Sequence, residues 1–512
     1  MNLNRRNFLF GSAAATALAG CATNTDKIGL RPLKAGEKRR VAMIGYGIQM
    51  RTALLPSFLG KAKGTEKVPN YVTVVAVCDC DKTRREAGKK AVDECYGNTD
   101  CKAVADFRDV LRDTSIDAVC IATPDHWHAY MAVEAMKNGK DVYCEKPLTF
   151  CVDEAKKVIA AQEKYGRVFQ TGSMQRSWDV FRTAVMIVRN GFIGDVMYVD
   201  ANYGRGGEKL GGPSHPIRFF DEPKNAATEG APNPDVDWNM WLGPAKWRPY
   251  SDQLAPRGVN KFYPMFWRFD DDIGTGYNGD WGAHHLDIAQ WGLDMDKSGP
   301  FKIIRSNEPY SDNLFHGGRR QFGMKMLFKK PYGTVELYHG PFGTWGTVFY
   351  GTKGIVAVNR GKIAVWEGAG VKPTAEIRKQ LEDASFKGMA LVAASVGKDY
   401  GTDATVKKDD VLDKTLAALK KKYDLDNPKL NQLYKSSNQI LNFVECIESR
   451  KPTISPAEVG GRGAILCQLC NMSYMYDTGF DWDPEKNDFA GENKLGIPLK
   501  RDVYRNGWEV VV

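Results

Sequence analysis

Three residues of this chain have the types and the spacing needed to remove a proton from a hydroxyl group. Lys146 follows Glu145, and Asp280 and His284 lie four residues apart much later in the chain. A neutral imidazole can accept the proton, and an ammonium group can stabilise the alkoxide that forms. If the later segment is helical, Asp280 lies one turn from His284, where a carboxylate orients an imidazole and stabilises its protonated form. We predict that Lys146, Asp280 and His284 are catalytic.

A glycine turn predicts where a nucleotide binds. Gly45-Tyr46-Gly47 ends a short apolar run, and Ile48 opens a helix-like segment. Glycine suits such a turn because a pyrophosphate must approach the backbone and the N-terminus of the helix closely. Met50 stands where the complete fingerprint has a third glycine or alanine. The position of the turn between a strand and a helix nevertheless predicts a dinucleotide site that includes Gly45, Gly47 and Ile48.

The end of the second predicted strand bears on the identity of the cofactor. Asp79 lies there, and an acidic side chain at this place accepts hydrogen bonds from the adenosine ribose and repels a 2′-phosphate. This residue favours NAD. Arg84 and Arg85 follow closely, and an arginine near that site can accommodate a 2′-phosphate, so NADP stays open.

Further polar residues follow the next predicted strands. Thr123-Pro124 comes directly after one apolar run and Glu145 after another. In an open parallel sheet, ligands bind outside the carboxyl ends of the strands. We therefore expect Thr123, Pro124, Glu145 and His128 to line the cofactor pocket. His126 and His128 are expected to line this pocket or to cap a helix rather than to perform chemistry.

The elements that must position these residues alternate between strands and helices in the first part of the chain. Strands are predicted at residues 38–45, 71–78, 116–122 and 141–144, and helices at 49–60, 84–95, 127–138 and 153–165. Nearly continuous apolar strands that alternate with helices predict a doubly wound parallel sheet, a Rossmann domain at residues 38–152.

The second part of the chain has longer, alternating strands separated by glycine-rich turns. They are predicted at residues 196–203, 321–328, 333–338 and 347–351. This pattern predicts a mostly antiparallel open sheet with helices. We assign residues 153–512 to this second domain, with irregular insertions near 204–265 and 361–430. An open sheet face favours a homo-oligomer.

The first 21 residues are predicted to be an export signal rather than part of the fold. Arg5-Arg6 precedes a short apolar run, as in a twin-arginine signal. Cys21 ends Leu18-Ala19-Gly20-Cys21, which is similar to a bacterial lipobox. We expect an exported, periplasmic or membrane-anchored protein that contacts the membrane only through a lipid on Cys21. A plain signal peptide with a chance cysteine is the alternative.

Composition limits the remaining classes of function. The formal net charge is +9, but 71 basic residues accompany 62 acidic ones. Basic residues interleaved with aromatic ones on one face are not evident, so we expect no nucleic-acid partner. Eleven cysteines do not form a disulfide framework, although Cys95 and Cys101 are near enough in sequence to bridge. Cys467 and Cys470 have no second ligand pair, and we expect no metal site.

The order of the motifs carries a resemblance to a known family. Gly45-Tyr46-Gly47, Thr123-Pro124, Glu145-Lys146-Pro147 and Asp280-x-Gly282-x-His284-x-x-Asp287 occur in sequence. Together they resemble the glucose–fructose oxidoreductase and inositol dehydrogenase (Gfo/Idh/MocA) family. The resemblance implies that Lys146 hydrogen-bonds the reacting hydroxyl and positions the nicotinamide. It also implies that His284 is the general acid/base and Asp280 the carboxylate beside it.

The second domain supplies residues suited to a sugar. Aromatic rings stack on the apolar faces of pyranose rings, and polar groups bind their hydroxyls. The predicted substrate-binding residues are Arg176, Trp267, Arg268, Trp281 and His285. His285 points about 100° away from His284 around a helix and is the weaker candidate for chemistry. No arginine cluster is evident in the sequence, so we expect a neutral sugar, cyclitol or glycoside.

Export raises the question of how the enzyme keeps its cofactor, because free NAD is scarce outside the cytoplasm. A twin-arginine route exports folded proteins, so a tightly bound cofactor travels with the chain and is recycled in place. One alternative is an NAD-dependent glycoside hydrolase that oxidises its substrate transiently. Another is a non-catalytic sugar-binding lipoprotein, which predicts loss of Lys146, His284 or the glycine turn, and all three are present.

Overall fold

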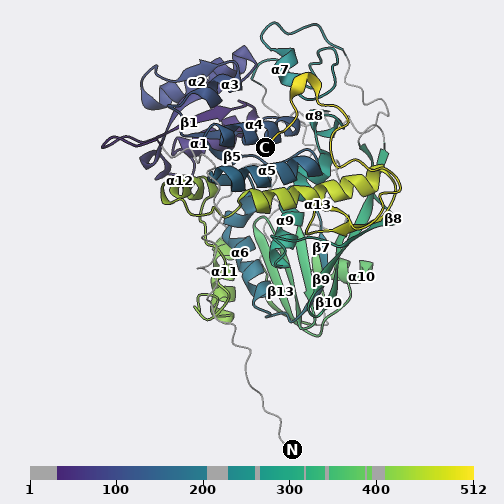
Figure 1. Ribbon diagram of the computed structural model, residues 1–512. Coiled ribbons are helices and arrows are strands. Elements are labelled where there is room, and N and C mark those ends of the chain that lie inside the picture. The colour runs from purple at the N-terminus through teal and green to yellow at the C-terminus, as the bar shows by residue number, and fades with distance from the viewer. Residues whose placement is uncertain are drawn as a thin grey trace, which may run out of the picture.

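The structure is a computed structural model with two packed α/β units (Figure 1). It describes residues 31–203, 229–259, 266–315, 319–340, 345–383, 385–386, 389–394 and 410–512. The first unit is built on a parallel sheet and the second on a larger sheet. Helices α5 (Val152–Tyr165) and α13 (Ala457–Met475) pack against each other between the two.

The first sheet is parallel throughout, as predicted. Its six strands lie in the order β3-β2-β1-β4-β5-β6. Their bounds are β1 Arg39–Ile44, β2 Val72–Cys78, β3 Lys102–Val104, β4 Ala118–Ile121, β5 Asp141–Cys144 and β6 Phe169–Thr171. The strands are short and almost wholly buried because helices cover both faces.

The helices of the first unit begin and end at residues that suit these positions. Asp81 caps the N-terminus of α2 by accepting from the Arg84 amide, and Gly97 ends the helix in the left-handed region. The helices are a π-turn at Met50–Leu54, α1 Leu55–Phe58, α2 Lys82–Tyr96, α3 Phe107–Arg112 and α4 Asp125–Lys137.

The first unit extends beyond residue 152, where the sequence predicted that the Rossmann domain ends. The chain crosses back through α5 and adds β6 to the first sheet, beyond that boundary. A helix that returns the chain to a neighbouring parallel strand completes a further βαβ unit. Helix α12 (Gln439–Ser449) also belongs to this unit, since Phe443 and Ile447 pack in its core.

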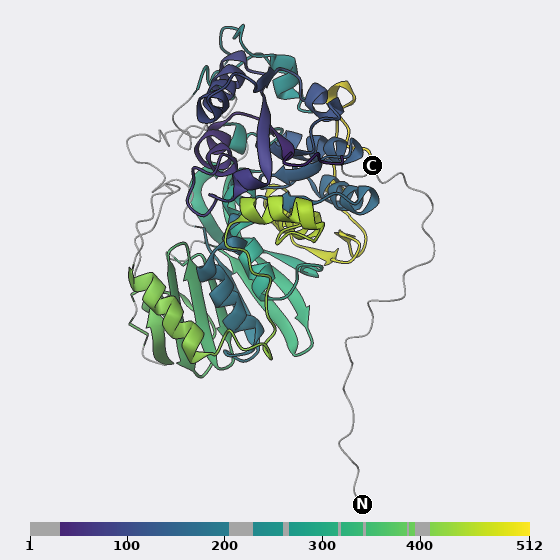
Figure 2. The same ribbon diagram turned by 90° about the vertical axis from the view of Figure 1, so that its left-hand side faces the viewer.

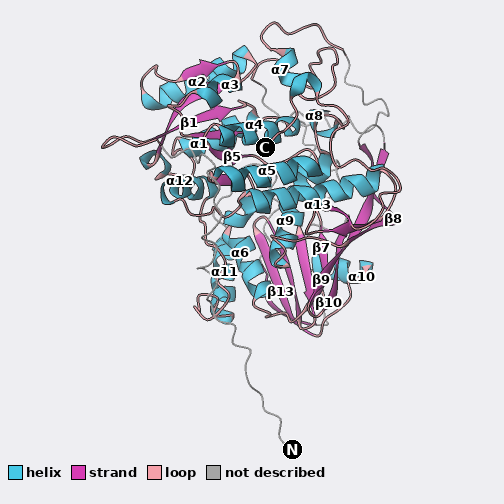
Figure 3. Cartoon of the chain, in the orientation of Figure 1, coloured by secondary structure: helices cyan, strands magenta, loops and turns pink. Residues whose placement is uncertain are grey.

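The second sheet has ten strands, of which only β7 and β10 pair in parallel in the described ladder. Its order is β14-β13-β12-β11-β7-β10-β9-β8-β15-β16. The bounds are β7 Val196–Ala201, β8 Lys302–Phe315, β9 Arg319–Lys330, β10 Gly333–His339, β11 Thr347–Gly351, β12 Gly354–Asn359, β13 Lys362–Gly368, β14 Met389–Ala394, β15 Phe480–Asp483 and β16 Asp488–Phe489. Figure 3 shows these strands as a broad array below the helices.

One face of the second sheet packs against helices and holds the larger core. Helices α6 (Asp179–Arg189), α9 (Ala283–Gly292) and α13 cover it. Helix α11 (Asp410–Lys422) packs on α6 and the β13–β14 edge (Figure 2). Two short helices, α7 (Trp238–Leu242) and α8 (Phe266–Phe269), lie in the connection between β7 and α9.

The segment 361–430 is not the irregular insertion that the sequence suggested. It contains β13, β14, α11 and α10 (Ala375–Glu382). Arg378 on α10 binds the buried carboxylate of Asp200 with two hydrogen bonds of 2.8 Å, so this helix covers part of the outer face of the sheet. The apolar runs 363–366 and 389–394 are the signals in the sequence that could have identified β13 and β14. Of the other predicted insertion, residues 204–228 and 260–265 lie outside the described residues.

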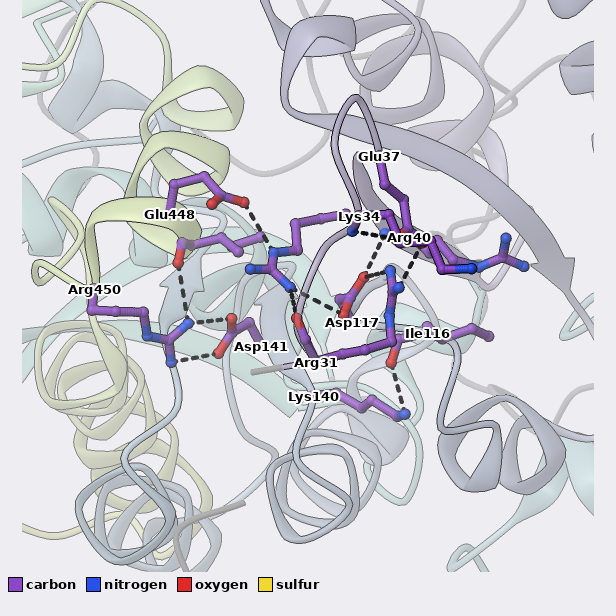
Figure 4. A network of polar contacts seen from close by, with 12 residues as sticks. Arg31, Lys34, Glu37, Arg40, Ile116, Asp117, Lys140, Asp141, Glu448 and Arg450 are labelled. Atoms are coloured by element: carbon purple, nitrogen blue, oxygen red, sulfur yellow. Dashed lines mark hydrogen bonds and ion pairs between the residues drawn. The ribbon is translucent and has the colours of Figure 1, made fainter. Parts of the chain in front are cut away.

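A network of buried charges closes the amino-terminal edge of the first sheet (Figure 4). Asp117, directly before β4, accepts from Arg31 at 3.0 Å and from the Arg40 amide at 2.8 Å. Asp141, the first residue of β5, accepts from Arg450 at the end of α12. These contacts hold the first described segment and α12 at the edge opposite the predicted site.

The described residues bear on a possible disulfide and on a possible membrane-spanning helix. Cys95 and Cys101 are free thiols, contrary to the suggested bridge, and Asp93 and Lys89 bind the backbone of Cys101 instead. Cys467 and Cys470 are buried in α13. Among the described residues, no helix is long and apolar enough to span a membrane.

Candidate active site

The glycine turn after β1 has the shape needed by a dinucleotide. Gly45 has a φ of +87°, and a Cβ there would lie 2.7 Å from the Ala122 carbonyl oxygen. Any side chain would therefore strain the backbone and push β1 from β4. Gly47 differs, because a Cβ there would meet nothing within 4 Å. The space in front of Gly47 fits a pyrophosphate that approaches the amides at the start of the helix.

Asp79 lies beside this turn, as predicted for a residue that binds the adenosine ribose. Its carboxylate accepts from the Tyr46 amide at 2.7 Å and from the Asp81 amide at 2.9 Å. Each carboxylate oxygen has a second lone pair for a ribose hydroxyl. Arg84 contacts Asp81 and donates to the Pro256 carbonyl at 2.7 Å, whereas Arg85 stays near the Asp79 backbone.

The residues after β4 form the next wall of the site. Thr123 packs against the glycine turn, and its buried hydroxyl has no hydrogen-bond partner in the described structure. Pro124 precedes α4 as its N-cap residue. His128 on α4 lies between two carbonyl groups, with Nδ1 2.7 Å from Pro147 and Nε2 2.9 Å from Thr123. His128 therefore connects the turns that follow β4 and β5.

His126 and Glu145 are also buried at this edge. Burial lowers the pKa of His126 to about 3, and its Nε2 lies 3.1 Å from the Trp241 carbonyl oxygen. Its ring therefore packs against the backbone of α7. Glu145 accepts from Gln49, near the start of the helix after the glycine turn, at 3.3 Å. Burial raises the pKa of Glu145.

Lys146 and Asp280 meet across the two units. The Lys146 Nζ donates to Asp280 Oδ1 at 2.5 Å and to the Asp280 carbonyl at 2.9 Å. Arg268 lies 3.5 Å from the other carboxylate oxygen. Burial opposes the charged form of Asp280, but Lys146 and Arg268 outweigh it and lower the pKa. Asp280 is therefore a carboxylate that fixes the position of the Lys146 ammonium group.

A π-turn at Asn278–Gly282 places Asp280 in this pair. Gly279 permits the turn because a Cβ there would overlap the Thr275 side chain and approach Pro147 to 3.3 Å. Asp125, at the start of α4, accepts from the amide and the hydroxyl of Thr275 at 3.0 and 2.6 Å. These hydrogen bonds hold the segment that leads to Asp280 against the N-terminus of α4.

His284 lies at the start of α9 but is not paired with Asp280 as the helical spacing predicted. The wider π-turn precedes it and Asp280 binds Lys146, so no hydrogen bond or ion pair joins the two among the described residues. The His284 Nδ1 is buried without a partner. Burial, followed by the charges of Lys146 and Arg360, lowers the pKa of His284 well below its usual value. The imidazole is therefore neutral at pH 7, which suits a general base.

Two of the predicted substrate-binding residues, Arg176 and His285, are buried in the protein. Arg176 is 1% exposed, and it binds both Asp287 and Asp296 with hydrogen bonds of 2.7–3.0 Å, so its guanidinium group is already used. The sequence motifs do not predict that Asp287 and Asp296 bind Arg176. His285 is 1% exposed and stacks on Trp281 at 6.3 Å. Burial lowers the pKa of His285 to about 3.

The other predicted aromatic residues remain at the site. Trp281 is partly buried beside His284, with ring centroids 5.9 Å apart. Trp267 lies under Arg268, whose guanidinium carbon is 4.2 Å from the ring centroid. Arg268 and Trp267 thus come to the Lys146–Asp280 pair from α8.

Sequence reasoning missed Arg360 and Gln175. Arg360, in the turn between β12 and β13, lies over Trp281 at 4.7 Å and donates to Gln175 Oε1 at 2.9 Å. Gln175 in turn donates to the His284 carbonyl at 3.2 Å. No local motif identifies Arg360, because only the sheet brings this turn beside α9.

The comparisons with known proteins agree with this architecture. Residues 39–173 match the oxidoreductase family with an NAD-binding Rossmann fold, and residues 217–320 match the C-terminal α/β domain of the same family. The first unit is thus an NAD-binding Rossmann domain. The chain belongs to the Gfo/Idh/MocA family of oxidoreductases.

Curated relatives match part of the chain. An uncharacterized oxidoreductase of Rhizobium meliloti (ORF334) is 32% identical over 31% of this chain and 43% of its own length. A glycosyl hydrolase family 109 protein of Shewanella sp. (strain ANA-3) is 30% identical over 39% of this chain and 46% of its own length. The matches therefore span less than half of these relatives.

Solved structures share the fold at low sequence identity. An oxidoreductase domain protein from Kribbella flavida has a TM-score of 0.51 at 16% identity, with 87% of this chain and 99% of that one covered. The WlbA dehydrogenase from Chromobacterium violaceum, in complex with NADH and UDP-GlcNAcA, has a TM-score of 0.52 at 14% identity, with 88% and 98% covered. These similarities concern the fold alone.

Proposed function

We propose that this protein is an oxidoreductase that transfers hydride between a ring carbinol carbon of a sugar, cyclitol or glycoside and a tightly held nicotinamide dinucleotide. The observation that carries the proposal is the meeting of Lys146, Asp280 and His284 beside the carboxyl edge of the NAD-binding sheet. These groups came from segments 134 residues apart along the chain. Their chemical types suit the removal of a hydroxyl proton.

Each of the three side chains has a different role in that reaction. The nicotinamide dinucleotide supplies the hydride acceptor or donor when it is bound. His284, kept neutral by burial and by Lys146, accepts the hydroxyl proton as the carbinol is oxidised. The Lys146 ammonium group stabilises the negative charge that develops on the oxygen. Asp280 holds that ammonium group in place.

Several residues support NAD as the preferred cofactor. Asp79 is the acidic residue at the end of β2, beside the glycine turn, and a carboxylate at this place would repel the 2′-phosphate of NADP. Arg84 is already engaged with Asp81 and with the Pro256 carbonyl, which reduces its use for a phosphate. Arg85 keeps NADP as the weaker choice.

The aromatic and polar groups around His284 support a carbohydrate-like substrate. Trp281 lies beside His284, and Arg268 and Arg360 lie over the rings of Trp267 and Trp281, so aromatic and polar groups are combined there. The WlbA dehydrogenase, which shares the fold, was solved with a sugar nucleotide.

A glycoside hydrolase that uses transient oxidation and elimination is the second candidate. It is favoured by the similarity to glycosyl hydrolase family 109 proteins, which is 30% identity over 39% of this chain for the Shewanella protein. The same Lys146 and His284 would oxidise a ring hydroxyl, after which the aglycone leaves and the ring is reduced again. A non-catalytic sugar-binding lipoprotein is disfavoured by the retained pair of Lys146 and Asp280.

We also propose that the protein is exported and anchored through a lipid on Cys21, and that it forms a homo-oligomer. The sequence of the first 21 residues supports export. The outer face of the second sheet remains the natural contact surface where α10 does not cover it.

Analysis of the bound nucleotide and of the products tests this proposal. The protein is purified without added nucleotide and denatured, and the released molecules are identified by mass spectrometry. We expect near-stoichiometric NAD(H). The native protein is then incubated with free sugars and with glycosides. Ketosugar or reduced sugar products support the oxidoreductase, and a released aglycone supports the hydrolase. A protein that binds no dinucleotide, even when it is added, contradicts both.

A further inference from the structure

A segment of the second unit crosses the mouth of the dinucleotide site. We name residues 233–256 the strap; α7 lies within it. Its first part pairs with the backbone directly after Asp79. The Lys82 amide donates to the Asp235 carbonyl at 2.7 Å, and the Asp237 amide donates to the Cys80 carbonyl at 3.1 Å. An antiparallel bridge between Asp81 and Val236 lies between these two bonds.

The middle of the strap binds the start of α4. The Trp127 Nε1 donates to the carbonyl oxygens of Met240 and Trp241 at 3.1 and 3.2 Å. His126 Nε2 lies 3.1 Å from the same Trp241 oxygen. Gly243 lets the backbone approach, since a Cβ there would lie 2.2 Å from the Trp127 ring. The strap is therefore packed against this helix without space between them.

These two contacts lie on opposite sides of the glycine turn. In the strand order β3-β2-β1-β4, strand β1 and its turn at Gly45–Gly47 stand between the ends of β2 and β4. The strap binds residues 80–84 after β2 and residues 126–127 after β4. It therefore spans the carboxyl edge of the sheet from the end of β2 to the end of β4, with the glycine turn between these two contacts. Figure 1 shows α7 beside α2 and α3 at the end of the first unit.

The strap is held as a unit by contacts outside the dinucleotide site. Trp238 and Trp241 stack with ring centroids 4.8 Å apart, and Asp237 caps α7. On its outer side, Arg505 near the C-terminus donates to the carbonyl oxygens of Asn239 and Ala245 at 2.8 and 2.9 Å. Arg505 thus ties the strap to the C-terminal segment, and the neighbouring Asn506 adds a side-chain hydrogen bond of 3.3 Å to Asn239.

We propose that the strap encloses the adenosine end of the dinucleotide, so that the bound nucleotide leaves only when the strap detaches. This inference rests on the proposed function, and it makes the dinucleotide a permanent group of the enzyme rather than a diffusing substrate. The hydride taken from one carbinol must then be returned to a second carbonyl compound, or to the same ring, in the same site. The class of reaction is a closed oxidation and reduction with no net change in the nicotinamide.

Exchange of bound nucleotide tests the strap directly. The purified holoprotein is mixed with an excess of isotopically labelled NAD, and the replacement of unlabelled NAD is followed by mass spectrometry. We expect exchange to be slower than catalytic turnover. Hydrogen exchange at the amides of Lys82 and Asp237 is measured in the same sample, and nucleotide exchange is expected to be no faster than opening at these amides.

Arg505→Ala loosens the strap without touching the nucleotide site. It removes three hydrogen bonds made by a charged group, two to Asn239 and one to Ala245, and we expect nucleotide exchange to accelerate by about tenfold or more. Arg112→Ala is the matched control, because Arg112 pairs with Asp109 on α3 and contacts no strap residue among those described. A circular dichroism melt of each variant confirms folding, and Arg84→Ala, which removes the bond to Pro256, is a second strap variant.

The outcomes separate this inference from the proposed function. Wild-type exchange faster than turnover, or an Arg505→Ala rate equal to that of Arg112→Ala, overturns the strap and leaves the oxidoreductase intact. If the nucleotide is trapped but no sugar or glycoside changes its redox state, the result supports the strap and contradicts the proposed function. Failure to bind NAD at all overturns both.

Discussion

Replacement of Lys146 by glutamine removes the ammonium group at the centre of the site while keeping a side chain of similar length. In the structure the Lys146 Nζ lies 2.5 Å from Asp280 Oδ1 and 2.9 Å from the Asp280 carbonyl oxygen, and the Lys146 side chain is 15% exposed. The group is thus shielded enough for its charge to act strongly on a developing alkoxide.

The size of the effect follows from two contributions. Removal of one preorganised donor to an oxyanion typically lowers the rate by about 10²–10³-fold, which is about 2.7–4 kcal/mol. Loss of a partner from a buried ion pair costs about 3–5 kcal/mol of stability when the other charge is left alone. Arg268 remains 3.5 Å from Asp280, so we expect the loss of stability to be smaller, about 2 kcal/mol.

Single-turnover absorbance at the band of reduced nicotinamide measures the chemical step, and urea unfolding measures the stability. Lys157→Gln is the matched control, because Lys157 pairs with Asp153 on α5 away from the site. A Lys146→Gln protein whose rate of hydride transfer is within about threefold of the wild-type rate would refute the role of Lys146, since a preorganised oxyanion donor contributes far more.

Three further predictions follow from the same contacts. First, kcat/KM for oxidation keeps its value as the pH falls below 6.5, because burial and Lys146 hold the pKa of His284 well below its usual value; an acid limb centred at pH 6.5 or above in a pH–rate profile would show that another group is the base. Second, the free energy of unfolding falls as the pH drops below 6.5, because the unfolded chain protonates His126, His285 and His339, whose pKa is about 3 in the folded protein. The slope is up to about 1.4 kcal/mol per histidine and pH unit, partly offset by Asp125 and Glu145, whose pKa burial raises; urea unfolding at pH 5 and 7 with equal stability would contradict it. Third, Arg176→Met destabilises the fold by about 3–5 kcal/mol, because Asp287 and Asp296 lose their buried partner, whereas Arg112→Met, which removes an exposed pair with Asp109 on α3, should change the unfolding midpoint little.

The fold of the first unit was predictable because its signals are local. A parallel sheet buried on both faces needs continuous apolar strands, and the predicted strands at β1, β2, β4 and β5 coincide with the observed ones to within two residues at each end. The glycine turn has one position that requires glycine for steric reasons and one that leaves open space. The sixth strand was missed because Phe169–Thr171 is only three residues long.

The site was predictable only in its residue types. Lys146 and Asp280 were identified from their motifs, but their pairing was not, because a π-turn replaced the regular helix that the spacing assumed. Arg176 was assigned to the substrate because its two carboxylate partners are 111 and 120 residues away. Arg360 was missed for the same reason, since β12 and β13 bring it to α9 from a turn without a recognisable motif.

Absorbance of the purified protein on addition of substrate tests the central claim most directly. The full-length protein, isolated without added nucleotide, is mixed with a panel of neutral sugars, cyclitols and glycosides under anaerobic conditions. We predict that at least one of them changes the near-ultraviolet band of reduced nicotinamide by an amount equal to the bound cofactor, and that Lys146→Gln slows this change. A protein that contains NAD but shows no change with any carbinol, ketosugar or glycoside would contradict it.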